Sequence, residues 1–285
     1  MPWISRLHQD EVGGWGSNEH DEECDMMLSS SFHGSRAPRS GTGVLLHQDR
    51  QTSSFLFGDR TVTVSSNKGI LTPSSIVVDI DSLPKASIAR FGGDTFQTES
   101  YSIRLQKPID LSLPMGMSFD VQSCEKAIRP FVQVRDRSIS TALLVNQGKA
   151  NVPSGQEGFI IKRQVSVLSE TKSLKELANG LLGSGYGSIP SGDNFLVGII
   201  LVNNLLGENL SSVRDVVSQY ANFVSRTMLL DAMDGHYSAH VGALGAAMVL
   251  GTYVERHANA LVNVGHSSGS DTLAGIWYAL SRMEA

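Results

Sequence analysis

Two stretches of the chain match each other without a gap: residues 191–199 read SGDNFLVGI, and residues 268–276 read SGSDTLAGI. Ser, Gly, Leu, Gly and Ile recur in register, and both copies hold Asp or Asn at the fourth position. A short polar start followed by an apolar run is typical of the beginning of a helix. The match predicts two equivalent helix N-termini, and we expect them to face each other across one site.

The first copy follows a glycine-rich segment, residues 183–190 (turn 1), which reads GSGYGSIP. Three alternate glycines permit positive φ angles and bring backbone N–H groups close to a ligand. Ser191 or Asp193 can cap the following helix. The exposed N–H groups and the helix dipole then favour an anion such as phosphate or carboxylate. Turn 1 is neither a P-loop nor a Rossmann fingerprint, because it lacks the closing Gly-Lys-Ser/Thr and a surrounding βαβ unit.

The second copy follows residues 265–267 (turn 2), which read GHS. His266 is a candidate acid or base near neutral pH, or else a histidine hydrogen-bonded to its own turn. The alternative for both copies is a pair of well-capped helices whose glycines serve packing. Under the functional interpretation, the turns and helix starts contribute these anion-binding residues: Gly183, Gly185, Gly187, Ser191, Gly192, Asn194, Ser267, Ser268 and Gly269.

Asp193 and Asp271 are the candidate catalytic carboxylates, together with His266. Each can orient a substrate amide, accept a proton or hold a divalent cation, and each can equally serve as a helix cap. Arg226 and Thr227 form a candidate anion clamp, since a guanidinium pairs well with carboxylate or phosphate. The alternative for these two is an ordinary helix surface.

We expect no metal site and no cofactor. His236 and His240 stand four residues apart, but the stretch 234–238 has the composition of an interhelix turn, and no Glu follows His236 as in zinc proteases. The run from His20 to Cys24 holds metal-ligand residue types, but consecutive side chains point in different directions, so we interpret it as a solvated acidic run. Nothing marks Cys24 or Cys124 as a nucleophile, and no Gly-x-Ser-x-Gly elbow is present.

Outward from the two turns, the pattern predicts an α+β protein with three segments. Residues 1–40 show no periodicity and are expected to be loose, tightening near residues 26–28. Residues 41–168 are expected to form an antiparallel sheet or small barrel. The apolar and β-branched runs that indicate strands are residues 44–46, 54–57, 61–64, 75–78, 102–105 and 158–161. Residues 169–285 are expected to be helical.

The helical part shows apolar residues at spacings of three and four. One such set is Leu174, Leu177, Ala178, Leu181 and Leu182, and a second is Val213, Val216, Val217, Tyr220 and Val224. Residues 243–254 are small and apolar on nearly all sides, which is typical of a buried helix, and Gly245 and Gly251 permit close packing there.

The composition restricts the classes of partner that the protein can bind. The 285 residues include 23 Lys and Arg against 28 Asp and Glu, a net charge of −5, so we expect no attraction to nucleic acid or anionic lipid. The longest apolar run, residues 195–206, is too short to span a bilayer and holds two asparagines. Two cysteines and no apolar leader in the first 24 residues favour a cytoplasmic protein.

The glycine-rich motifs resemble those of a known family. Residues 183–198 are similar to the signature GLGPGLTPSGDDFLxG of the AllH family, and residues 265–275 resemble its closing motif GHTSGxDxLAG. Arg226 and Thr227 also fall where that family tends to carry an Arg-Thr pair. The resemblance covers about the last 110 residues, which is 39% of the chain.

The resemblance implies a subunit of a bacterial oxamate carbamoyltransferase. Such a protein works beside a large subunit similar to acyl-CoA synthetases and a further subunit, and homo-oligomers are possible. The implied reaction converts the small anion oxalurate and phosphate to oxamate and carbamoyl phosphate. Two other classes stay open: a non-catalytic anion-binding assembly subunit, and a free-standing enzyme acting on another amide or ureide in a specialised pathway. Asn194 departs from the family, which usually has an aspartate there.

Overall fold

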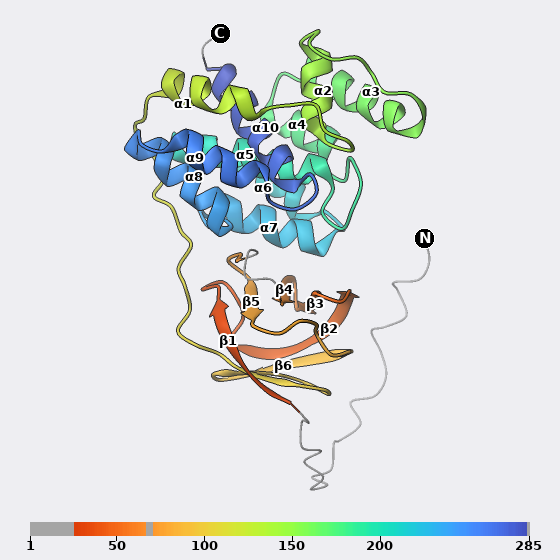
Figure 1. The fold of residues 1–285 in the computed structure, drawn as a ribbon, viewed down its shortest axis with the longest axis vertical. Helices are drawn as coiled ribbons and strands as arrows, with labels where there is room; N and C mark the ends of the chain where they lie inside the picture. The colour runs from red at the N-terminus through yellow and green to blue at the C-terminus, as the bar shows by residue number, and fades with distance from the viewer. Residues whose placement is uncertain (1–25, 67–70, 284–285) are drawn as a thin grey trace, which may run out of the picture.

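The computed structural model describes residues 26–66 and 71–283 and divides them into a β-barrel and a group of helices. The run from His20 to Cys24 lies outside these residues. In Figure 1 the barrel lies below the helices, and the segment between β8 and α1 runs along one side to connect them. None of the helices in the described part of the chain has the length and apolar character needed to cross a bilayer.

Eight strands close the barrel in the order β1-β5-β4-β3-β2-β6-β7-β8. Most neighbours are antiparallel, but β1 pairs with β8, and β4 with β5, in parallel. The barrel interior is filled by aromatic rings, with the Phe57 and Phe91 centroids 5.0 Å apart and those of Phe91 and Phe96 5.1 Å apart. The strands are β1 (Met27–His33), β2 (Ser40–Gln48), β3 (Thr52–Phe57), β4 (Arg60–Ser65), β5 (Ser75–Val78), β6 (Ile88–Gly92), β7 (Thr95–Thr98) and β8 (Ser102–Arg104).

The α+β prediction is confirmed, with corrections at the edges of the barrel. β1 lies within the segment that was expected to be loose, and its first residues pair with β8. Residues 158–161 were expected to be a strand but belong to helix α3, whose buried residues recur at spacings of three and four. A four-residue apolar run fits a strand or a buried helical face equally well, so its neighbours decide. Strands give way to helices between Arg104 and Val121, and not near residue 168.

The helices surround a central pair, α5 and α10, in which nearly every residue is buried. Their bounds are α1 (Val121–Ile128), α2 (Ile139–Asn146), α3 (Gly155–Glu170), α4 (Leu174–Leu181), α5 (Ser191–Leu205), α6 (Ser211–Ser218), α7 (Phe223–Met233), α8 (Ala239–Leu250), α9 (Val254–Val262) and α10 (Ser268–Ser281), with a 3₁₀ turn at Arg129–Phe131.

Two helical patterns end earlier than their apolar spacing predicts. The set from Val213 to Val224 is divided between α6 and α7. The buried helix expected at residues 243–254 ends at Leu250, because Gly251 takes a left-handed conformation with φ 65° and caps α8. Gly245, in contrast, does permit close packing, since a Cβ there would lie 2.6 Å from Leu113.

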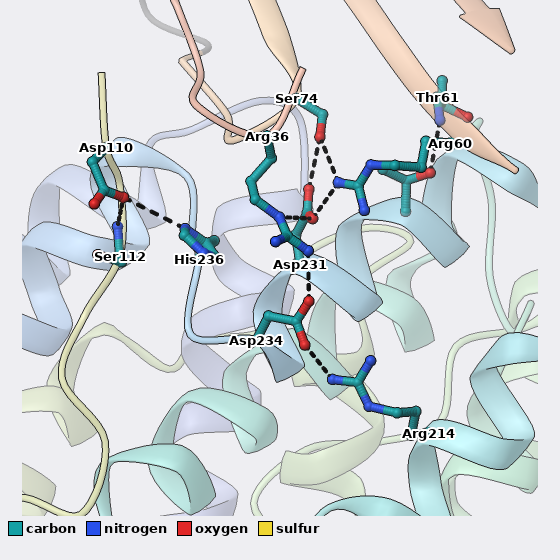
Figure 2. A network of polar contacts seen from close by, with 11 residues as sticks. Arg36, Arg60, Thr61, Ser74, Asp110, Ser112, Arg214, Asp231, Asp234 and His236 are labelled. Carbon is teal, nitrogen blue, oxygen red and sulfur yellow. Dashed lines mark hydrogen bonds and ion pairs between the residues drawn. The ribbon is translucent and has the colours of Figure 1, made fainter. Parts of the chain in front are cut away.

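Helix α7 attaches the helices to the barrel through a network of charges (Figure 2). Asp231 is buried and accepts hydrogen bonds from Arg36 (3.2 Å), Arg60 (2.5 Å) and Ser74 (2.8 Å), all three from the barrel. One turn further on, Asp234 pairs with Arg36 at 2.5 Å and with Arg214 of α6. The two carboxylates thus fix the end of α7 against the barrel.

Candidate functional site

The sequence repeat corresponds to a structural repeat of two helical hairpins. The first hairpin is α4, turn 1 and α5, and the second is α9, turn 2 and α10. In the first, Gly192 donates its N–H to Ser184 (2.8 Å), and a Cβ on Gly192 would lie 2.1 Å from the Leu181 oxygen. The second hairpin repeats this arrangement: Gly269 donates to Val264 (3.1 Å), and its Cβ would lie 1.8 Å from the Leu261 oxygen.

The two hairpins meet where α5 crosses α10, at the second glycine of each motif. A Cβ on Gly198 would lie 2.1 Å from the Thr272 oxygen, and one on Gly275 would lie 2.0 Å from the Phe195 oxygen. Residue numbers rise along α5 as they fall along α10, so the helices run antiparallel. Their N-termini lie at opposite ends of the pair, which differs from the expectation that they face each other across one site.

The first residues of both helices are held by backbone, and not by the caps that the sequence predicts. Pro190 precedes α5 and Ser267 precedes α10, and neither makes a side-chain capping bond. The Ser191 hydroxyl donates instead to the Ser184 oxygen at 3.3 Å. Gly192 and Gly269 donate their N–H groups to the preceding turn. These helix ends therefore offer a ligand fewer free donors than expected.

Turn 1 contains consecutive backbone N–H groups that donate no hydrogen bond within the described residues. Gly183, Gly185 and Gly187 all have positive φ angles (73°, 117° and 93°), as expected for a turn that needs glycine. The backbone N–H groups of residues 185–189 have no acceptor in the part of the chain that the structure describes. The Gln164 amide supports the turn from α3 by donating to Ser184 Oγ at 3.0 Å.

Asp193, in the first turn of α5, holds turn 1 in place. It is fully buried, and its two oxygens accept the Gly183 N–H (2.9 Å) and the Tyr220 hydroxyl (3.1 Å). Burial raises the pKa of the Asp193 carboxyl group, and these hydrogen bonds oppose the rise. Asp193 therefore positions the first glycine of the turn and has no exposed surface for a ligand.

Asp271 has the corresponding role at α2. Its Oδ1 accepts the Ser138 hydroxyl (2.6 Å) and the Ile139 N–H (2.9 Å), which lie at the beginning of that helix. The carboxyl group is fully buried, and Oδ2 has no hydrogen-bond partner. Burial raises the pKa of Asp271 to about 7, although the hydrogen bonds that the carboxyl group accepts, from Ser138 first, lower it. Its charge therefore changes near neutral pH.

One segment connects turn 1 with the beginning of α10, and the sequence pattern did not single it out. The Arg137 guanidinium lies 5.3 Å from the ring centre of Tyr186 in turn 1, while the next two residues bond Asp271. Arg137 has an unusual φ of 59°, and its exposed side chain has no ion-pair partner among the described residues. Its guanidinium brings a positive charge beside Tyr186, whose N–H is one of the unpaired donors of turn 1.

The remaining predicted residues lie apart from this arrangement. Thr227 accepts the Thr61 N–H at 2.9 Å, and Arg226 donates to the Asp59 oxygen at 3.3 Å, so both contact the barrel. His266 is exposed in turn 2, and Asn194 is buried in the first turn of α5. Only turn 1, Asp193 and Asp271 are therefore brought into one connected structure, through Arg137 and the two residues after it.

Fold and site define a class: an α+β protein whose helices are built around a duplicated hairpin, with a donor-rich glycine turn supported by buried aspartates. The model of the protein family described as oxamate carbamoyltransferase subunit AllH matches residues 181–280, from the end of α4 into α10. This match contains both glycine-rich motifs and confirms the resemblance read from them. Searches of curated proteins and of solved structures each gave no match.

Proposed function

We propose that the chain is a component of a carbamoyltransferase that converts oxalurate, or a related ureide, and phosphate into oxamate and carbamoyl phosphate. The observation that carries this proposal is turn 1. It combines free N–H groups at residues 185–189 with the Arg137 guanidinium, and it lies inside the stretch that matches the carbamoyltransferase subunit family. Backbone donors beside a guanidinium suit a carboxylate or a phosphate.

The reaction has a place for such a site. Phosphate oxygen attacks the carbamoyl carbon of oxalurate, the bond from that carbon to the oxamate nitrogen breaks, and the nitrogen takes up a proton. Negative charge develops on the carbamoyl oxygen on the way, and N–H donors aimed at it lower the barrier. Asp193 and Asp271 are buried, so we assign them positioning roles: Asp193 holds turn 1, and Asp271 holds the segment that carries Arg137. His266 lies in turn 2, apart from turn 1, so we assign it no step at this site, and its role as an acid or base stays a prediction from the sequence.

The test uses the complex isolated from its source cells through a tag on this chain, which retains the large subunit and the further subunit that the proposal pairs with it. Carbamoyl phosphate formation is measured with oxalurate and phosphate varied in turn. Removing the Arg137 charge with Arg137→Gln is expected to raise KM for at least one of the anions by roughly 10-fold or more, because a hydrogen bond to a charged group contributes about 1.5–3 kcal/mol.

The matched control is Arg135→Gln, two residues away in the same loop, which is expected to leave both KM values unchanged. Equal KM values for wild type and Arg137→Gln would remove Arg137 from the site. A complex that contains all its subunits but forms no carbamoyl phosphate from oxalurate would refute the proposed reaction.

A second candidate is a non-catalytic anion-binding subunit that stabilises a partner enzyme. The observation that favours it is that Asp193 and Asp271, the sequence-predicted catalytic carboxylates, are both buried and occupied with backbone N–H groups. Unchanged kcat in an intact complex carrying Arg137→Gln and His266→Ala together would support this second function. A loss of kcat would support the first.

A further inference from the structure

The connection between α8 and α9 carries two apolar side chains that are far more exposed than such residues usually are. Leu250 and Tyr253 are each 72% exposed, and only two residues separate them. Tyr253 also has a left-handed backbone conformation with φ 57°, which residues other than Gly and Asn rarely adopt. The bend thus keeps a large aromatic side chain in solvent at a conformational cost.

Beneath this bend lies a hollow of about 280 Å³ between α1 and the beginning of α9. Its lining is Asp120, Ser123, Cys124, Ala127, Gly251, Tyr253, Val254 and Glu255. Burial raises the pKa of the Cys124 thiol to about 11, so the wall that Cys124 forms is neutral at physiological pH. The hollow is too small for a large ligand and suits a single side chain from another protein.

The charged residues that line the hollow have one sign, and Lys126 of α1 is a cation close enough to Asp120 to help lower its pKa. Asp120 and Glu255 are the charged residues of the lining, and both are carboxylates. Ser123 donates its N–H (3.0 Å) and its hydroxyl (2.7 Å) to Asp120. Hydrogen bonds from Ser123 lower the pKa of Asp120, so this carboxylate stays ionised. A partner that fits must therefore bring a positive charge next to an apolar surface.

From this combination we infer that residues 250–255, with the hollow beneath them, dock a segment of a partner protein that inserts an arginine or lysine between Asp120 and Glu255. Apolar residues flanking that cation cover Leu250 and Tyr253. Tyrosine on this chain and arginine on a partner are both residue types that are enriched at the centres of protein interfaces. The inference rests on the proposed function in one respect: the partner is the large subunit of the carbamoyltransferase complex.

The position of the surface fits this role. In Figure 1, α8 and α9 lie on the opposite flank of the helices from α2 and α3. Arg137 lies two residues before α2, so substitutions at residues 250–255 lie away from turn 1. Docking and anion binding are therefore separable by mutation.

The test measures the affinity of the purified full-length chain for the purified large subunit by calorimetry. Tyr253→Asn removes the aromatic ring and places a residue that tolerates positive φ at this position, so the fold is retained. Glu255→Lys reverses the charge beside the hollow. Each change is expected to weaken binding at least 10-fold, and the affinity of the wild type is expected to fall as salt is raised.

Phe159→Asn is the matched control, since Phe159 on α3 is 73% exposed, and it is expected to change the affinity less than 2-fold. A photo-crosslinking residue at position 253 is expected to attach to a partner segment that contains arginine or lysine. Wild-type affinity in both variants would overturn the docking surface, as would crosslinking of position 253 to a second copy of this chain, or no binding of the large subunit at all. Binding that is lost in the variants, in a complex without carbamoyl transfer, would sustain the docking surface and refute the proposed function instead.

Discussion

The Asp271 carboxyl group is buried with one oxygen, Oδ2, unpaired, and its surroundings disfavour the charged form. Its pKa is raised to about 7 in the folded protein, above the ordinary aspartate value. A raised carboxyl pKa means that the folded state binds a proton which the unfolded state releases. The stabilising contribution is therefore complete below about pH 4 and is lost as the pH rises through about 7.

We expect Asp271→Asn to remove this dependence, because an amide is neutral and still presents an oxygen to Ser138 and Ile139. Relative to the variant, the wild type should lose up to about 4 kcal/mol of unfolding free energy between pH 4 and pH 8, since each pKa unit corresponds to about 1.4 kcal/mol. Urea titrations of both proteins across that range measure the difference. Parallel curves would show that Asp271 does not titrate there.

Residue types at the repeated motif were enough to single out Asp193 and Asp271 as candidates, but they left open whether each acts in catalysis or caps its helix. Their partners were not predictable. Asp193 bonds Tyr220, and Asp271 bonds Ser138, which lies 133 positions away in the chain. Arg137 was missed for a related reason: its positive φ and its place over Tyr186 depend on tertiary contacts that leave no mark in a single sequence.

At the scale of helices, the crossing of α5 and α10 depends on two glycines. Gly275→Ala would place a methyl group 2.0 Å from the Phe195 backbone oxygen, which cannot rotate away. The helices must move apart, and overpacking of this kind typically costs about 1–3 kcal/mol, so a loss at or above the upper end is expected. Chemical denaturation gives the value.

Gly242 in α8 is the control for that experiment, since no atom lies within 4 Å of a Cβ built there. Gly242→Ala is expected to stabilise the protein by about 1 kcal/mol through helix propensity alone. Equal effects at the two positions would show that α5 and α10 do not touch at their glycines.

β4 was predictable from the alternation of its sequence, although only Arg60 and Thr63 of this strand are partly exposed. α4 was predictable because its buried residues, Leu177, Ala178 and Leu181, follow helical spacing. The wrong predictions of secondary structure have a physical cause as well. Residues 158–161 form a short apolar run that either structure can bury, and the left-handed Gly251 ends α8 inside a stretch that is apolar throughout. The repeat was visible in sequence, but its antiparallel pairing was not, because only the contacts of Gly198 and Gly275 decide the direction.

At the scale of the whole molecule, the charges at the end of α7 bridge two separate hydrophobic cores, alongside the hydrogen bonds of Arg226 and Thr227 to the barrel. The side chain of Asp231 is 3% exposed and lies between Arg36 and Arg60, whereas that of Asp234 is 32% exposed. The sequence gives no sign of this junction, since Arg36 and Asp231 are separated by 195 positions.

Asp231→Asn is expected to cost about 2–4 kcal/mol, because the partly buried Arg60 guanidinium loses its counter-charge and Arg36 keeps only Asp234. Asp234→Asn, nearer the solvent, should cost about 1 kcal/mol or less. Urea denaturation measures both, and limited proteolysis of residues 105–120 reports whether the barrel separates. Similar losses in the two variants would mean that Asp231 is not the principal attachment.

The duplicated hairpin has a consequence for how this molecule can change. In a symmetric dimer, one substitution alters both halves of a self-complementary interface at once. Here both halves lie on a single chain, so each can vary alone while the glycines at the crossing hold the pair together. The first half has three more residues between Ser184 and Gly192 than the second has between Val264 and Gly269, and these residues lengthen turn 1. One hairpin is thus free to acquire chemistry while its twin preserves the framework.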